Sequence, residues 1–325
     1  MLQTLSKQSQ RAASGIMTPP SLIPGFALHD KIAEGGFAEI YDGEELISKK
    51  KVAIKILHPR HHTNKSEFKR LIHEGGIGMR IRNHDNVVKF LQVGKAGRAP
   101  YIVMEFIEGQ TLREILRDRK TLNDREVVVL AQAMASGVHY MHGEGIVHKD
   151  IKPENVMLGP DGTIKLIDLG FAESLTSVKW SLFGRSLEGS PAYMAPELLR
   201  SKKPSPATDL YAVGCTLYEA ATGTAPFTGH SDQEVLQKQL NMNLAAGSIR
   251  EKNQEISPYT ERLILNALEK NTSNRYKSVD EFRLELRRNP HLNNSSKHIP
   301  LPTGFAPRRQ NSSTRSSSRN RISGT

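Results

Sequence analysis

The sequence predicts an α+β fold with two lobes, a small β-rich lobe followed by a larger, mainly helical lobe. Alternating apolar and β-branched residues dominate residues 26–107, as expected for strands. From residue 108 to about 286, apolar residues recur mainly at helical spacing. A chain of 325 residues is also long enough to bury a substantial core in two lobes.

The composition predicts a soluble protein of the cytoplasm. The single cysteine, Cys215, excludes an intramolecular disulfide and fits a reducing compartment. It lies in the apolar run 210–221, which favours a buried hydrophobic role over a nucleophilic one. No stretch approaches the roughly 20 apolar residues of a membrane span, and the N-terminus lacks the apolar block of a secretory signal.

The net charge of +11 is concentrated at the two ends of the sequence. Residues 1–29 contain Lys7 and Arg11 without an acid, and residues 287–325 contain only basic charges. We therefore expect a flexible leader over 1–25 and a disordered, basic, Ser/Arg-rich tail over 287–325. Such a tail is more often solvated or phosphorylated than a specific nucleic-acid binder, so no nucleic-acid partner is predicted. The basic residues of the tail are Arg287, Arg288, Lys297, Arg308, Arg309, Arg315, Arg319 and Arg321.

A β-hairpin with a glycine-rich tip is predicted near the start of the small lobe. Gly35 and Gly36 lie between the apolar residues Ile32 and Ile40. Glycine lets a backbone approach a phosphate closely, although a glycine pair alone marks an ordinary turn more often than a nucleotide site.

Lys55 lies in the alternating segment K-V-A-I-K-I-L over 51–57, at the end of a β-branched run. A lysine that points inward from a strand is unfavourable unless it is paired. Glu74, in a segment with helical spacing, is the expected partner, and Glu67 is a weaker alternative. The other reading is that Lys55 faces solvent.

Two further strands are expected at 87–93 and 101–106, followed by a linker to the helical lobe. The first long helix is predicted over 124–141. Met134 and Met141 fall on its apolar face, so we interpret them as core residues rather than ligands.

The stretch I-V-H-K-D-I-K-P-E-N, residues 146–155, places an acid, a cation and an amide within reach of one another. Asp150 could accept a hydroxyl proton, Lys152 could neutralise phosphate, and Asn155 could ligate a metal. A polar turn whose charges face water is the alternative for these residues alone.

A strand–turn–strand hairpin follows, and its second strand is expected to end at Asp168, beside the Asp150 loop. Residues 171–190 have no clear period and predict a long loop, which in a compact domain is usually functional. Helical patterns then continue from Asp209 to about Arg288.

Taken together, these segments resemble the protein-kinase family, and specifically its eukaryotic-like serine/threonine branch. H-K-D-I-K-P-E-N resembles the catalytic loop, D-L-G at 168–170 the metal-binding motif, and A-P-E at 195–197 the end of the activation segment. The resemblance implies a two-lobed protein-kinase fold over 26–286, with an N-lobe at 26–107 and a C-lobe at 108–286.

The resemblance also implies a role for each matching residue in ATP-dependent phosphoryl transfer to proteins. Lys55 would hold the α- and β-phosphates, positioned by Glu74. Asp150 would accept the substrate proton and Lys152 would neutralise the γ-phosphate. Asn155 and Asp168 would hold Mg²⁺, with Mn²⁺ as an alternative. The residues implied to line the nucleotide site are Ile32, Ala33, Glu34, Gly35, Gly36, Phe37, Ala38, Ile40, Ala53, Lys55, Met104, Glu105, Ile107 and Met157.

The same resemblance favours serine or threonine over tyrosine as the acceptor. Lys152 matches the Ser/Thr-type loop, and Ser190 retains a hydroxyl expected to contact Asp150 and Lys152. It further implies two structural contacts, between Glu197 and Arg275 and between Asp209 and the backbone of the catalytic loop. For Met104 and Met157, simple core packing is an equally good interpretation.

Several residues depart from the family pattern. Ala33 and Ala38 replace common glycines, which predicts weaker or slower nucleotide handling. Lys149 replaces the usual arginine, so we hypothesise that activation-loop phosphorylation is weakly coupled to activity or unnecessary. Leu169 replaces the usual phenylalanine after the metal-binding acid. The glycines at positions 75, 76 and 78 predict a short or frayed helix, so that the Lys55–Glu74 pair forms only with ATP or a partner.

Two other functions are considered. A pseudokinase that binds ATP or acts as a scaffold is the first, although the sequence retains each residue the chemistry needs. A small-molecule kinase is the second, against which the A-P-E segment argues because it builds a peptide-docking platform. Autophosphorylation is also expected, while the sequence leaves the protein substrate and the oligomeric state open. Its candidate sites are Ser174, Thr176, Ser177, Ser181, Ser186 and the serines from Ser312 to Ser318.

Overall fold

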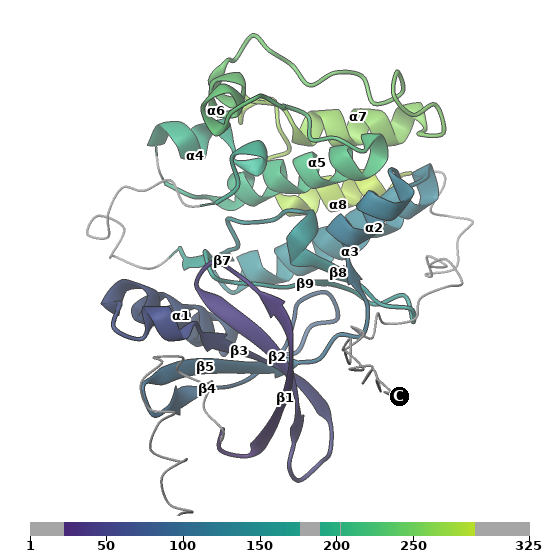
Figure 1. Ribbon diagram of the computed structural model, residues 1–325. Helices are drawn as coiled ribbons and strands as arrows, with labels where there is room; N and C mark the ends of the chain where they lie inside the picture. The colour runs from purple at the N-terminus through teal and green to yellow at the C-terminus, as the bar shows by residue number, and fades with distance from the viewer. Residues whose placement is uncertain (1–22, 176–188, 202, 290–325) are drawn as a thin grey trace, which may run out of the picture.

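The chain folds into two lobes, as predicted. A computed structural model describes residues 23–175, 189–201 and 203–289. Figure 1 shows a β-sheet and one helix, α1, in the N-terminal lobe, and the remaining helices in the C-terminal lobe. Residues 1–22 of the predicted leader and most of the predicted tail lie outside the described residues, whereas Ile23, which was expected in the flexible leader, is fully buried in the N-lobe.

The N-lobe is a five-stranded sheet in the order β1-β2-β3-β5-β4, with every neighbouring pair antiparallel. The alternating sequence explains why both faces are covered, because successive side chains point to opposite sides of a strand. One face packs with α1, and the other covers a separate cluster that includes Ile23, Tyr41 and Ile54. The strands are β1 (Phe26–Glu34), β2 (Ala38–Glu45), β3 (Lys51–Leu57), β4 (Phe90–Ala96) and β5 (Ala99–Glu105).

The predicted strand at 87–93 is shifted toward the C-terminus. Val87 and Val88 precede β4 and are buried in the cluster under α1. Val87 forms an isolated bridge with Leu166, and Val88 N donates to Leu166 O at 2.9 Å. These apolar residues therefore join the two lobes instead of extending the sheet.

Helix α1 (Lys65–Gly78) is complete, so the prediction of a short or frayed helix was wrong. Asn64 caps its first turn by accepting hydrogen bonds from the backbone N–H groups of Ser66 and Glu67. Added Cβ atoms at Gly75 and Gly78 would lie 2.5 Å from Val93 and 2.3 Å from Phe90. These two glycines allow the helix to pack closely on β4, and this contact compensates for their low helix propensity.

The C-lobe is built around α3 (Asp124–Gly143) and α5 (Pro206–Thr222). Helix α3 begins with a capping box between Asn123 and Glu126. Helix α5 is buried around most of its circumference, including Cys215, whose side chain is fully buried as expected. The other helices are α2 (Leu112–Arg119), α4 (Pro196–Ser201), α6 (Asp232–Leu240), α7 (Pro258–Ala267) and α8 (Val279–Arg287).

Short strands lie between the lobes and position the loops of the site. β6 (Gln110–Thr111), β8 (Val156–Leu158) and β9 (Ile164–Leu166) form a three-stranded sheet, and β7 (Ile146–Val147) pairs with β10 (Glu173–Ser174). The predicted hairpin at 156–168 is confirmed as β8–β9, but its second strand ends at Leu166 rather than at Asp168.

The packed part of the C-lobe extends beyond the predicted boundary at residue 286. Helix α8 continues to Arg287, and the Asn289 side chain is fully buried. Within the described residues, no helix combines the length and apolarity that a membrane span requires.

Candidate active site

The catalytic-loop residues lie together between β7 and β8. The Lys152 Nζ atom is 2.7 Å from Asp150 Oδ2, and Asn155 Nδ2 donates to Asp150 Oδ2 at 2.9 Å and to the Asp150 carbonyl at 2.7 Å. Asp150 and Asn155 are each only 5% exposed. The three side chains singled out in the sequence therefore form one cluster.

The backbone of this loop is held by a buried acid, as predicted. The N–H groups of His148 and Lys149 donate to the two carboxylate oxygens of Asp209, each at 2.8 Å. His142 Nε2 lies 2.9 Å from the same carboxylate. Burial raises the pKa of Asp209, but these hydrogen bonds and the neighbouring histidines outweigh it and lower the pKa below its usual value.

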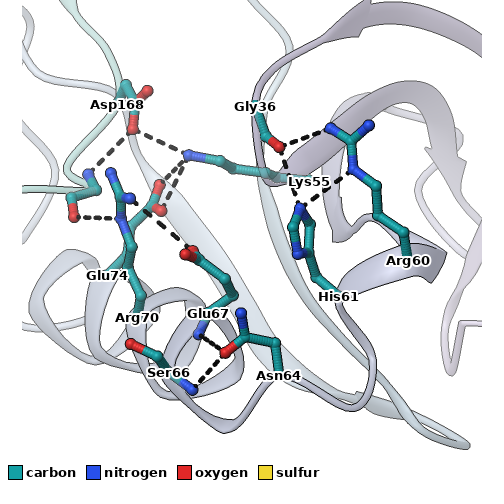
Figure 2. A network of polar contacts seen from close by, with 11 residues as sticks. Gly36, Lys55, Arg60, His61, Asn64, Ser66, Glu67, Arg70, Glu74 and Asp168 are labelled. Carbon is teal, nitrogen blue, oxygen red and sulfur yellow. Dashed lines mark hydrogen bonds and ion pairs between the residues drawn. The ribbon is translucent and has the colours of Figure 1, made fainter.

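Lys55 joins the two lobes through two acids. Its Nζ atom lies 2.7 and 2.9 Å from the two oxygens of Glu74 and 2.9 Å from Asp168 Oδ1 (Figure 2). The expected pair with Glu74 is confirmed, while its dependence on ATP or a partner stays a prediction. Glu67, the alternative partner, lies instead 3.9 Å from Arg70.

Lys55, Glu74 and Asp168 shift one another's pKa values. Burial raises the pKa of Glu74 to about 7, against the opposing effect of Lys55. Burial also opposes ionisation of Asp168, but the Lys55 ammonium outweighs it and holds the pKa of Asp168 well below its usual range. Burial lowers the pKa of Lys55, and its two carboxylate partners raise it further than burial lowers it. Of the two acids that contact Lys55, Asp168 is thus the stronger acid.

Asp168 adopts a backbone conformation that its sequence context did not indicate. Its φ is 61°, in the left-handed region, and Lys149 beside Asp150 has a φ of 69°. Gly170 N donates to Asp168 Oδ1 at 3.0 Å and fixes the carboxylate. The Asp168 side chain is 38% exposed, so its second oxygen can bind a ligand.

The glycine-rich hairpin is confirmed as the β1–β2 turn over residues 35–37. Gly35 N donates to Ala38 O at 2.8 Å, and Arg60 Nη2 donates to the Gly36 carbonyl at 2.8 Å. An added Cβ at Gly36 would have no heavy atom within 4 Å, so the outer side of the tip is open. Ala33 and Ala38 lie at the ends of the paired strands.

Some of the β3, β5 and β8 residues that were expected to line the nucleotide site lie close together. Ala53 is paired with Met104 across β3 and β5, and both pack in the same cluster as Ile107. Met157 is half-buried on β8, opposite Lys165. Glu105, the last residue of β5, accepts a hydrogen bond from Lys165 Nζ at 2.7 Å.

Two of the contacts expected around the activation segment are found among the described residues, whereas the contact expected between Ser190 and Asp150 is not among them. Lys152 Nζ donates to Ser190 Oγ at 2.9 Å, and Arg275 Nη1 lies 2.8 Å from Glu197 Oε1. Leu169 is fully buried, as expected for an apolar replacement. Most of the predicted loop at 171–190, with Thr176, Ser177, Ser181 and Ser186, lies outside the described residues.

Residues 26–283 match the protein kinase domain, which is most of the chain. The chain belongs to the protein kinase family. The prediction of this family and of its two-lobed fold is therefore confirmed.

Several relatives with curated descriptions are bacterial serine/threonine-protein kinases. The chain is 33% identical to PknL of Mycobacterium tuberculosis over 251 residues, covering 77% of this chain and 62% of the relative. It is 32% identical to PrkC of Bacillus subtilis over 256 residues, covering 79% and 39%. It is 31% identical to a probable PknB of Lactococcus lactis over 253 residues, covering 78% and 40%. The chain thus spans less than two thirds of the length of each of these relatives.

Two side chains near the site have no counterpart among the motifs. Glu173 on β10 lies 2.6 Å from Lys149, and Arg70 on α1 contacts rings from two loops. Glu173 lies 24 residues from its partner along the chain, and Arg70 lies 100 residues from Gly170. No local pattern links such distant residues, although the position of Arg70 one turn before Glu74 could have drawn attention to it.

Proposed function

We propose that the protein transfers the γ-phosphoryl group of ATP to serine and threonine hydroxyls of proteins. The observation that carries the proposal is that two groups from distant parts of the chain lie on adjoining segments, because the N–H of Ile167, next to Asp168, donates to the Asn155 carbonyl at 2.9 Å. Lys55, Glu74 and Asp168 form one hydrogen-bonded unit, and Asp150, Lys152 and Asn155 form the other. Together they supply the cations, the metal-binding oxygens and the base that phosphoryl transfer requires.

In the proposed reaction, the Asp150 carboxylate orients the acceptor hydroxyl and takes its proton. The hydroxyl oxygen forms a bond to the γ-phosphorus as the bond to the bridging oxygen of ADP breaks. Lys152, which is 2.7 Å from Asp150, offsets charge on the transferred group. Lys55 holds the remaining phosphates, and its attachment to Glu74 fixes its position. Asp150 is buried and already hydrogen-bonded, so little reorganisation is needed for this role.

The donor set fits a divalent metal. Asp168 offers a carboxylate oxygen, and the Asn155 nitrogen is bonded to Asp150, which leaves its amide oxygen for a ligand. Carboxylate and amide oxygens are the ligands that Mg²⁺ and Mn²⁺ take. Bound Mg²⁺ would neutralise phosphate charge, and Asn155 and Asp168 are the residues that would hold it.

Serine and threonine are the proposed acceptors. Lys152 contacts Ser190, which joins the catalytic loop to the segment before A-P-E, and the relatives are described as serine/threonine-protein kinases. Those descriptions also disfavour the pseudokinase and small-molecule alternatives.

Autophosphorylation and a location in the cytoplasm remain parts of the proposal. Ser174 is a poor phosphorylation site in this conformation, because it is 8% exposed and lies in β10.

We also propose that activity does not require a phosphorylated activation segment. Lys149 occupies the position from which a basic residue would contact an added phosphate, and it already lies 2.6 Å from Glu173. Its side chain is 15% exposed. Glu173 thus supplies a negative charge that phosphorylation would otherwise introduce.

The proposed function is tested by incubating the purified protein with γ-labelled ATP, Mg²⁺ and a general protein acceptor, then mapping the labelled residues. Wild type should label serine and threonine, whereas Asp150→Asn should lose about 10²–10⁴-fold of the rate, the usual contribution of a general base. Transfer to tyrosine alone would contradict the proposed acceptor. Equal rates for wild type and Asp150→Asn would contradict the proposed mechanism.

A further inference from the structure

The side chain of Arg70 lies between two aromatic rings that come from opposite sides of the site. Its guanidinium carbon is 4.3 Å from the centroid of the Phe37 ring and 4.0 Å from that of the Phe171 ring. Phe37 is at the tip of the glycine-rich hairpin, and Phe171 follows the D-L-G segment. Arg70 itself is on α1, one turn before Glu74. One side chain therefore touches the loops that flank the nucleotide and metal positions.

The arrangement is one that arginine stabilises particularly well. Its planar, weakly hydrated guanidinium stacks on aromatic faces, and the attraction is stronger where water is partly excluded. Arg70, Phe37 and Phe171 are each half-buried. The Arg70 Nε atom also donates to the Gly170 carbonyl at 3.4 Å, which adds a polar contact on the metal-binding side.

The two loops that Arg70 contacts also touch Lys55 and Asp168, the side chains proposed to bind phosphate and metal. The Phe37 ring lies 5.1 Å from Lys55 Nζ. Gly170, whose carbonyl accepts from Arg70, donates its N–H to Asp168 Oδ1 at 3.0 Å. A change at Arg70 is thus transmitted over one contact to the glycine-rich tip and over two contacts to the Asp168 carboxylate.

Arg70 affects the charges of the site only from a distance. Its ionic neighbour is Glu67, at 3.9 Å, and its charge also lowers the pKa of Glu74 from a distance. Within the described residues, Arg70 forms no ion pair with Asp150 or Asp168. Besides this electrostatic effect on Glu74, Arg70 can act on the site by holding the two aromatic rings in place.

We propose that Arg70 is a positioning residue that couples closure of the glycine-rich tip to the placement of Asp168. The coupling rests on the proposed phosphoryl transfer for its functional meaning, because only then must both loops hold one nucleotide and its metal at the same time. Phe37 and Phe171 are the two faces through which Arg70 acts. Loosening either face releases the other, since both stack on the same guanidinium.

Hydrogen exchange of the protein without nucleotide tests the coupling directly and requires no activity. The backbone N–H groups of Gly35 and Ala172 are hydrogen-bonded within their loops, so their exchange reports opening. Arg70→Met keeps the length of the side chain but removes the cation. It should speed exchange in peptides covering 33–38 and 168–173 together, by about fivefold or more, as expected for loss of two cation–π contacts. Arg70→Lys should give an intermediate rate, because lysine retains the charge but not the planar stack.

A matched control is Arg98→Met, which removes an exposed arginine from the turn between β4 and β5. It should leave exchange of both loops unchanged. Exchange that rises in only one loop of Arg70→Met, or in neither, would overturn the proposed coupling.

Steady-state kinetics supply a second readout. Arg70→Met should raise KM for ATP about tenfold with a smaller fall in kcat, and Arg70→Lys should recover part of the loss. Adding Phe37→Leu or Phe171→Leu to Arg70→Met should cause little further change, because the shared contact is already lost. Faster turnover in Arg70→Met would show that the stacked Phe37 obstructs the site, and would overturn the proposal. If wild type itself transfers no phosphoryl group, the proposed function fails, while the exchange result still stands or falls by itself.

Discussion

The catalytic loop and the glycine-rich hairpin face the same site but are held by different kinds of contact. Two backbone N–H groups of the catalytic loop bind the carboxylate of Asp209, which is fully buried. The hairpin tip is held by long, partly exposed side chains, through Arg60 on the Gly36 carbonyl and Arg70 on the Phe37 ring. In the proposed reaction, the first arrangement would fix the base before any ligand arrives, whereas the second would open to admit a nucleotide. The difference assigns rigidity to the chemical half of the site and adjustability to the binding half.

Among the substitutions considered, we expect the largest effect from one that removes the anchor of the catalytic loop. Asp209→Asn replaces one of the two accepting oxygens by an amide nitrogen, which faces a backbone N–H donor. We expect a loss of about 2–3 kcal/mol in the free energy of unfolding, as is usual for a buried unsatisfied group. Turnover should fall about 100-fold or more, since misplaced catalytic groups lose that much rate. Denaturant unfolding and initial rates measure the two effects.

Asp280→Asn is the control for that substitution, because the Asp280 side chain is 60% exposed. It should change the free energy of unfolding by less than about 0.5 kcal/mol. An Asp209→Asn protein as stable and as active as wild type would contradict the account of the loop anchor.

The acid limb of the activity profile should be set by Glu74 on the adjustable side. Burial raises the pKa of Glu74 to about 7, so its charge, and with it the ion pair to Lys55, is lost as the pH falls through that value. Wild-type kcat/KM should therefore decline on acidification. Glu74→Gln should be about tenfold slower at high pH, comparable to losing one charged hydrogen bond, and nearly flat between about pH 6 and pH 8.

Stability should follow the opposite trend over the same pH range. The folded pKa of Glu74 lies above the value of about 4.3 for an unperturbed glutamate. The folded state therefore binds more protons, and this group increases its contribution to stability as the pH falls from about 7 toward 4. Activity should consequently be lost without a fall in Tm. A parallel fall of Tm and activity would point to unfolding instead.

A smaller effect is expected at the ion pair between Lys149 and Glu173. Glu173→Gln removes a partly exposed pair, so turnover should fall only about two- to fivefold. Phosphatase treatment should leave wild-type turnover unchanged, because Glu173 already neutralises Lys149. The control Glu234→Gln removes a more exposed pair with Lys238 on α6 and should have no effect on turnover. Abolition of turnover by phosphatase would refute the proposal.

The smallest effects concern two neighbouring glycines of α1. Gly76→Ala should stabilise the protein by up to about 1 kcal/mol, because no atom obstructs the added methyl and alanine has the higher helix propensity. Gly75→Ala should instead destabilise it by about 1–3 kcal/mol, since the new methyl would meet Val93 at 2.5 Å. Urea unfolding of the two variants compares them directly. Similar stabilisation by both would show that α1 does not pack closely on β4.

The sequence was sufficient for features whose cause is local or carried by a family motif. The hairpin at Gly35, the strand that carries Lys55 and the cluster around Asp150 are all found as predicted. The glycines of α1 misled because helix propensity is a local quantity, whereas their packing on β4 is tertiary.

Other features depend on contacts that no local pattern contains. The left-handed backbone of Asp168 depends on its surroundings as well as on its residue type, since aspartate adopts this region more readily than most residues. Arg70 and Glu173 act through partners that only the folded chain brings near.

The central claim is that two separately held groups meet in one site, with Lys55 serving nucleotide binding and Asp150 serving chemistry. The most direct test measures Mg²⁺-ATP affinity by calorimetry and phosphoryl transfer by label incorporation in the same preparations of wild type, Lys55→Met and Asp150→Asn. We predict that Asp150→Asn binds the nucleotide as tightly as wild type yet transfers almost nothing, whereas Lys55→Met is impaired in both. Transfer at the wild-type rate by Asp150→Asn, or unaltered affinity and transfer in Lys55→Met, would contradict the account.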